Sequence, residues 1–314
     1  MVQEKSMISF IIPVYNSEKT IGQCLESVLS QKGEKEVIVV YTPSKDRTLE
    51  IIKKFKGIEI IVCKKTGPAV ARNLGLERAK GEYIACVDSD CVLPERWAEK
   101  AVNLLKDKKL AGVGGPGISK EKSLVSQALD ALLFGVHKNV KKKYVLSLAT
   151  MDVMYRRSAI EGLRFDESLI TGEDPEFNFR LGKRGYKLLF SRELWVYHYH
   201  PATLGGVLKK WYNYGKQYPL PFFRHKKMSA GFFARVFYFP LLLMWVLLSF
   251  FNQVFLFVLF VQVFLLFLMY FYIGIKTCNG RVLLVFPFVH TLKQLVQVFG
   301  IWVGVVKRLK KKSL

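Results

Sequence analysis

The stretch that decides the fold is Tyr83-Ile84-Ala85-Cys86-Val87-Asp88-Ser89-Asp90, in which an apolar run ends at two carboxylates. A short apolar run that follows Gly81 predicts a strand buried on both faces, as in a parallel sheet. Asp88 and Asp90 stand two residues apart, so a turn can direct both toward one small, hard cation. Such a cation can neutralise a diphosphate. Because an Asp-x-Asp also arises by chance, its weight comes from the strand before it and from the other motifs of the chain.

The segments before this strand alternate between strand and helix patterns. The predicted strands are 9–14, 36–40, 58–63 and 83–87, and the helices between them are 20–29, 48–55 and 69–79. This β-α-β order predicts an α/β fold with a mostly parallel sheet and helices on both faces. Ligands of such sheets bind at the carboxyl ends of the strands, where Tyr15, residues 41–46 and the carboxylate pair fall. For residues 144–200 we expect shorter strands and one helix at 174–184.

Charge divides the chain into two parts. All 25 acidic residues lie in 1–225, whereas 226–314 carries 11 Lys and Arg and is otherwise dominated by Phe, Leu and Val. We therefore expect a water-soluble domain over 1–225 and a membrane region over 226–314. The net charge of +23 suits nucleic acid, an anionic bilayer or phosphorylated ligands. No helix-turn-helix, zinc-knuckle or RRM-like pattern occurs, so nucleic acid is not an expected partner.

Three apolar stretches and a basic C-terminal tail make up the membrane region. Residues 232–251 and 254–275 are each long enough to cross a bilayer core. The third stretch, 282–306, is interrupted on one side by the polar residues His290, Lys293, Gln294 and Gln297. That spacing favours a helix lying in the interface, with a third crossing as the alternative. Basic groups flank the spans, so the positive-inside rule predicts a multi-pass protein of the cell membrane whose soluble domain is cytoplasmic.

The cysteines, at positions 24, 63, 86, 91 and 278, form no Cys-x-x-Cys pair. Most lie inside apolar stretches, so we expect reduced packing residues rather than disulfides or a zinc site. We also expect no signal peptide, because residues 1–5 lead directly into the first predicted strand.

Three further motifs are candidates for chemistry. Gly67-Pro68-Ala69-Val70-Ala71-Arg72-Asn73-Leu74-Gly75 is typical of a small-residue helix start, which either directs N–H groups and Arg72 to the sheet edge or only permits close packing. The acidic residues of Thr171-Gly172-Glu173-Asp174-Pro175-Glu176 are common helix caps, although one carboxylate can instead accept a proton from a hydroxyl. His198 and His200 alternate on a predicted strand, which fits either a structural role or contact with metal or phosphate.

In this order, the motifs of residues 7–220 resemble those of the family 2 glycosyltransferases, an inverting group with a GT-A (Rossmann-like) fold. The matching segments are Ile11-Ile12-Pro13-Val14-Tyr15-Asn16, residues 67–75, Asp88-Ser89-Asp90, Glu173-Asp174 and His198. The resemblance implies that 1–225 is a catalytic domain, that Asp174 is its base, and that Mg²⁺ or Mn²⁺ binds at Asp90, Asp88 and His198. The donor-binding residues that it implies are Pro13, Tyr15, Tyr41, Ser44, Asp46, Ala69, Arg72, Asn73, Asp88, Ser89 and Glu173.

Two departures from the family's pattern concern the donor. The family's second strand usually ends at an Asp that reads the nucleotide base, and Tyr41 stands there instead. A phenol can stack on a base or donate to it, but it cannot accept a base N–H as a carboxylate does. The family also often has Gly-Asn where this chain has Thr150-Met151-Asp152, so an unusual sugar pocket is expected.

We expect a membrane-anchored inverting glycosyltransferase that moves a sugar from a nucleotide diphosphosugar to a lipid-phosphate, lipid-linked or glycan acceptor. The basic aromatic segment 209–216 fits either acceptor binding or a simple anchor in the lipid interface. A processive synthase with its own channel is disfavoured, because the spans are few and the Gln-x-x-Arg-Trp motif is absent. The alternative is a non-catalytic GT-A-fold membrane adaptor, which the substitution at Tyr41 favours and the intact carboxylates disfavour.

Overall fold

The computed structural model describes residues 7–120, 122–133, 141–169, 171–217, 230–278 and 280–312. It forms two compact units, of which the first comprises Met1–Lys120 and Asn139–Tyr199. The second comprises Glu121–Lys138 and His200–Leu314, so it begins before residue 226. It takes in α5 (Leu124–Leu133) and α8 (Leu204–Gln217) because both pack against α12 (Arg281–Lys312).

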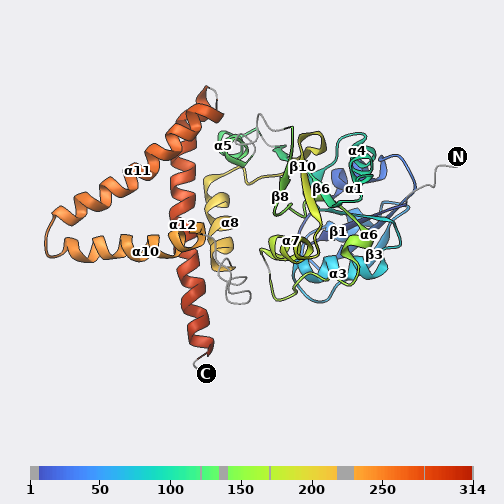
Figure 1. The fold of residues 1–314 in the computed structure, drawn as a ribbon, viewed down its shortest axis with the longest axis horizontal. Coiled ribbons are helices and arrows are strands. Elements are labelled where there is room, and N and C mark those ends of the chain that lie inside the picture. Colours follow the sequence, from blue (N-terminus) through green and yellow to red (C-terminus); the bar gives the residue numbers. More distant parts are fainter. Residues whose placement is uncertain are drawn as a thin grey trace. The chain divides into compact units, whose positions relative to one another are not determined.

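The first unit is built on an eight-stranded sheet with the order β3-β2-β1-β4-β9-β6-β10-β8 (Figure 1). Its strands are β1 (Ile8–Val14), β2 (Lys35–Tyr41), β3 (Glu59–Val62), β4 (Tyr83–Val87), β6 (Leu110–Gly114), β8 (Lys142–Val145), β9 (Asp152–Arg156) and β10 (Lys187–Ser191). Strands β3, β2, β1 and β4 run parallel, and β10 is parallel to β6. Strand β9 is antiparallel to both β4 and β6, and β8 is antiparallel to β10. The predicted mostly parallel sheet is confirmed.

Helices cover both faces of this sheet, as predicted (Figure 1). One face is covered by α1 (Ile21–Leu29), α2 (Thr48–Ile52) and α4 (Trp97–Leu105). The other is covered by α3 (Pro68–Arg78), α6 (Arg157–Ile160) and α7 (Glu173–Lys183). Strand β1 shows why: Phe10 and Ile12 pack with Leu25 of α1, whereas Ile11 belongs to the core under α3. Successive side chains of a strand point to opposite faces, so an unbroken apolar run needs cover on both.

A second, smaller sheet begins shortly after β4 ends. It consists of β5 (Cys91–Val92), β11 (Val196–His198) and β7 (Gly117–Ser119), with β11 in the middle. Strand β11 is antiparallel to β5, with His198 opposite Cys91, and parallel to β7. Strand β5 follows β4 through a tight turn, in which the Cys91 N–H donates to the Asp88 carbonyl at 2.9 Å. This turn holds the carboxylate pair at the carboxyl end of β4.

The second unit consists of α5, α8, α10 (Ala230–Ser249), α11 (Val254–Thr277) and α12. Two polar residues of α12, His290 and Lys293, lie inside this unit, whereas Gln294 and Gln297 are half-buried. His290 is fully buried, with Nε2 at 2.9 Å from the Ala128 carbonyl oxygen of α5. Lys293 is buried as well, with Nζ 5.0 Å from the centre of the Trp211 ring of α8. Helices α8 and α12 approach so closely that a Cβ at Gly215 would overlap the Gln297 carbonyl.

Two helices among the described residues are long and apolar enough to cross a membrane, namely α11 and the Arg281–Lys307 part of α12. Helix α11 coincides with the predicted span 254–275. Helix α10 covers most of the predicted span 232–251, and its part Pro240–Ser249 is a shorter apolar helix. The interfacial position expected for 282–306 stays a prediction, and two of the polar residues on which it depends, His290 and Lys293, contact α5 and α8.

Candidate active site

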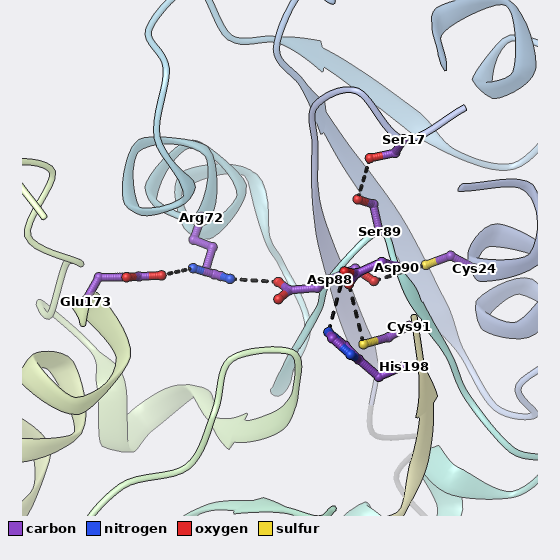
Figure 2. Close-up of polar contacts among 9 residues, drawn as sticks. All are labelled: Ser17, Cys24, Arg72, Asp88, Ser89, Asp90, Cys91, Glu173 and His198. Carbon is purple, nitrogen blue, oxygen red and sulfur yellow. Dashed lines mark hydrogen bonds and ion pairs between the residues drawn. The ribbon is translucent and has the colours of Figure 1, made fainter. Parts of the chain in front are cut away.

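The two carboxylates of the turn after β4 have different partners (Figure 2). Asp88 accepts a hydrogen bond from Arg72 Nη2 at 2.7 Å. The Asp90 Oδ2 atom lies 3.5 Å from His198 Nε2. Between them, the Ser89 hydroxyl is 2.7 Å from the Ser17 hydroxyl, which ties the turn to the segment after β1. The sequence predicted that both carboxylates face one cation, whereas in this structure Asp88 is directed to a guanidinium.

Arg72 links the turn to helix α7. Besides Asp88, it donates to Glu173 Oε1 at 2.8 Å, and its side chain is only 3% exposed. Although burial opposes it, the charges of Asp88 and Glu173 raise the pKa of Arg72 above its ordinary value. Helix α3 can present Arg72 here because it packs tightly on β1, where a Cβ at Gly75 would overlap Ile11. The close packing expected of the motif at 67–75 is thus present, and Arg72 of the same motif reaches Asp88.

Asp174 lies in the first turn of α7, immediately after Glu173. It is half-buried. Burial first, and then the negative charge of Glu173, raise the pKa of Asp174 to about 7, and Arg72 partly opposes the shift. A carboxyl group with a pKa near neutrality exchanges a proton readily at physiological pH. The position therefore fits a general base.

Asp90 and two neighbouring residues bring three possible metal-ligand atoms, an oxygen, a sulfur and a nitrogen, close together. The side-chain ligand atoms of Asp90, Cys91 and His198 all lie within 4.8 Å of one another. A carboxylate and an imidazole fit Mn²⁺, and a carboxylate alone fits Mg²⁺. Cys91 is fully buried, and burial together with the charges of Asp90 and Asp88 raises the pKa of its thiol well above the ordinary value. The predicted ligands Asp90 and His198 are thus brought together, and the Cys91 sulfur lies near both.

The loop predicted to contact the nucleotide base is held together by hydrogen bonds among its own residues, Tyr41, Ser44 and Asp46. Tyr41 is buried, and its hydroxyl accepts a hydrogen bond of 3.0 Å from the Ser44 N–H. The Ser44 hydroxyl donates to Asp46 at 2.7 Å. Burial alone would raise the pKa of Asp46, but hydrogen bonds from Ser44, Thr48 and Glu18 lower it to about 2. The phenol that replaces the family's Asp is therefore an acceptor for this loop.

The remaining predicted donor residues differ in their accessibility. Tyr15 follows β1 and is 56% exposed, and Pro13 is half-buried. Ala69 and Asn73 are buried in α3. The Asn73 amide donates to the Phe165 carbonyl at 2.9 Å and accepts from the Phe165 N–H at 2.8 Å. In this structure Asn73 anchors the segment before α7, which is a positioning role rather than an open contact.

Two residues near the site were not among the ligands, base or donor-binding residues that the sequence predicted. Cys91 is one of them, and its position next to the predicted metal ligand Asp90 was the only indication in the sequence. The other is Asp152, which is 1% exposed, pairs with Val87 across β9 and β4, and accepts from the Gly115 N–H at 3.0 Å. Burial raises its pKa well above the ordinary value. His200, by contrast, lies with Asp130 at 3.2 Å in the second unit, so the two histidines have different partners.

Comparisons with known proteins agree on a family. The family model described as glycosyl transferase family 2 matches residues 9–164. Glycosyltransferase AglE of Haloferax volcanii is 31% identical over 230 residues, which is 69% of this chain and 74% of that protein. A poly-beta-1,6-N-acetyl-D-glucosamine synthase of Staphylococcus aureus is 27% identical over 221 residues, or 67% of this chain, and the chain spans only 54% of its length.

Solved structures show the same fold. A mannosyltransferase, PcManGT from Pyrobaculum calidifontis, in complex with GDP-Man and Mn²⁺, superposes with a TM-score of 0.60 at 15% identity, over 99% of this chain and 89% of that one. Residues 1–349 of S. aureus TarS in complex with UDP give a TM-score of 0.50 at 18% identity, over 97% and 92% of the two chains. The fold is therefore GT-A-like. On its relatives and its fold, the chain is a glycosyltransferase and belongs to glycosyl transferase family 2.

Proposed function

We propose that this glycosyltransferase takes its sugar from a nucleotide diphosphosugar and transfers it with inversion. The observation that carries the proposal is that one sheet edge holds Asp90 beside His198 and, across Arg72, the first turn of α7 with Asp174. The donor class is supported by the fold neighbours, whose titles name GDP-Man and UDP.

Asp90 and His198 would hold a divalent metal, Mg²⁺ or Mn²⁺. When bound, the ion would act as a Lewis acid that offsets the negative charge of the diphosphate leaving group. Asp90 is 37% exposed on its side chain, so a ligand can reach it from solvent, whereas His198 orients it from the buried side. The Mn²⁺ in the PcManGT complex supports this class of ion.

Asp174 would act as the base. Its carboxylate takes the proton of an acceptor hydroxyl, whose oxygen attacks C1 of the sugar while the bond from C1 to the diphosphate breaks on the opposite face. A single displacement of this kind inverts the configuration and needs one base. Arg72 and Glu173 hold the helix N-terminus that presents Asp174.

A membrane location would bring this site to a lipid-phosphate or lipid-linked glycan acceptor. Helices α11 and α12 supply the candidate spans. In α8, Lys210 and Lys216 lie over the rings of Tyr214 and Tyr212, at 5.8 and 4.7 Å. Aromatic and basic side chains of this kind favour the membrane interface and its phosphates. In this proposal the catalytic unit lies on the cytoplasmic side, which the positive-inside rule supports if 232–251 and 254–275 are the two crossings, because the flanking basic groups then share one face.

The test uses washed membranes that contain the protein, a panel of radiolabelled UDP- and GDP-sugars, and Mg²⁺ or Mn²⁺. Label that enters an organic extract with one donor, and does not in Asp174→Asn membranes, identifies the sugar and a lipid acceptor. Release of nucleoside diphosphate without extractable label keeps the transferase and excludes the lipids of those membranes as acceptors. No transfer and no release with any donor would overturn the proposal and favour the adaptor.

A further inference from the structure

We propose that Cys91 is a protein ligand of the metal at Asp90, and that it makes the site selective for Zn²⁺, Co²⁺ or Mn²⁺ over Mg²⁺. The inference rests on the proposed function in one respect, because the same ion would serve the donor diphosphate. Metal binding can nevertheless be measured without any transfer reaction. From the sequence we expected Cys91 to be a packing residue, and its surroundings in the structure assign it a second role.

Strand pairing brings Cys91 to the site. Cys91 in β5 and His198 in β11 are directly opposite each other in an antiparallel pair, so their side chains lie on one face. Asp90 precedes Cys91, and Figure 2 shows its carboxylate in contact with both the thiol and the imidazole. The Cys91 sulfur is 3.9 Å from Asp90 Oδ1, and His198 Nε2 is 3.5 Å from Asp90 Oδ2. The ligand atoms of all three residues lie within 4.8 Å of one another.

The three ligands are held by the backbone as well. The Tyr199 N–H donates to the Asp90 carbonyl at 3.0 Å, which ties the turn to the end of β11. Within the turn, the Cys91 N–H donates to the Asp88 carbonyl at 2.9 Å. On the side of β11 away from β5, β7 packs closely against His198. A Cβ added at Gly117 of β7 would lie 3.3 Å from His198 Cβ. Ligands fixed on strands and a tight turn are preorganised for a cation.

The donor set decides which metal fits. A carboxylate, a thiolate and an imidazole are the ligands of zinc sites, and three protein ligands leave one position open for a substrate. Mg²⁺ prefers oxygen ligands in octahedral geometry and gains little from sulfur. On binding, the S–H bond of Cys91 is replaced by a metal–sulfur bond and the proton leaves to solvent, with no change of oxidation state. The open position would receive a diphosphate oxygen.

Asp88 is the competing choice for the third ligand. It is held by Arg72 at 2.7 Å, and turning it toward Asp90 would leave a buried guanidinium with one partner fewer. Cys24 provides a matched control, since it is also fully buried near the turn, but its thiol faces the Asp88 carbonyl oxygen at 3.5 Å. A cysteine that only packs would behave like Cys24.

The test is a Co²⁺ titration of the purified full-length chain in detergent, without donor. Wild type and Cys24→Ser are expected to show a near-ultraviolet sulfur-to-cobalt charge-transfer band that Zn²⁺ abolishes. Cys91→Ser is expected to lose the band and to bind Zn²⁺ at least about tenfold more weakly. A band that persists in Cys91→Ser, or wild-type protein that shows no band, would overturn the proposal.

A second measurement does not depend on a variant that folds. X-ray absorption of the wild-type Co²⁺ or Zn²⁺ protein should show one sulfur neighbour at about 2.3 Å. A shell of nitrogen and oxygen alone would overturn the proposal. In transfer assays, Cys91→Ser should lower the ratio of Mn²⁺-supported to Mg²⁺-supported activity, and an unchanged ratio would also count against it. A sulfur ligand found in a protein that transfers no sugar would leave this inference standing and remove the proposed function instead.

Discussion

Asp88 and Glu173 are joined through one guanidinium, since Arg72 donates a hydrogen bond to each, at 2.7 and 2.8 Å. Asp88 belongs to the turn at the end of β4, whereas Glu173 begins the helix that carries Asp174. A single buried cation therefore connects the carboxylate edge of the sheet with the proposed base. We therefore expect a substitution of either Asp88 or Glu173 to change the position of the other carboxylate, because both are held by Arg72.

Replacing Arg72 tests this connection. Arg72→Met leaves Asp88 and Glu173 without their shared cation, and Glu173 is only 8% exposed. Removing one partner of a buried ion pair costs about 3–5 kcal/mol, which thermal unfolding in detergent can measure. The matched control is Arg96→Met, because Arg96 pairs with Glu99 at 2.7 Å with 61% of its side chain exposed. The control should cost less than about 1 kcal/mol, and equal costs would contradict the account.

The rate of transfer should follow the titration of Asp174. With a pKa of about 7, the carboxylate form of the base grows as the pH rises through neutrality. We therefore expect kcat/KM to rise roughly tenfold per pH unit in the acid range and to level off above pH about 8. The check is a profile measured with saturating metal over that range. A flat profile would remove Asp174 from the role.

The stability of the fold should also depend on the titration of Asp174, but it should fall with rising pH where the transfer rate increases. The folded-state pKa of Asp174 is raised above the ordinary value of an Asp, so the folded protein binds the proton more tightly than the unfolded chain. Its contribution therefore becomes less favourable as the pH rises from about 4 to about 8. Asp174→Asn should raise the melting temperature at pH 8, and the gain should shrink as the pH falls toward 4. A gain independent of pH would argue against a raised pKa.

Tyr41 should affect donor binding by holding its loop in place rather than by contacting the nucleotide base directly. Tyr41→Phe removes the acceptor of the Ser44 N–H and should cost about 0.5–1.5 kcal/mol. Because the loop from Tyr41 to Asp46 would loosen, we expect a higher KM for the donor with little change in kcat. Tyr144→Phe, at a tyrosine that is 56% exposed, serves as the control and should change neither. Wild-type donor KM in Tyr41→Phe would contradict this role.

The parts of the fold that follow from local pattern were predictable. Strands β1 to β4 are near-continuous apolar runs, and the carboxylate pair is placed by the strand before it. Pairings between distant segments were not predictable: nothing in the sequence shows that Arg72 takes Asp88, or that His198 stands opposite Cys91. The polar stripe of α12 illustrates the same limit, because a helix shows one pattern whether that stripe faces lipid headgroups or other helices.

The most direct test of the central claim is single-turnover transfer by wild type and Asp174→Asn with a saturating labelled donor. Donor binding is measured on the same preparations. We expect a loss of about 10²- to 10⁴-fold in transfer with donor binding unchanged. Glu193→Gln, at a carboxylate that is 55% exposed, should transfer at the wild-type rate. Transfer by Asp174→Asn within a few-fold of wild type would contradict the account.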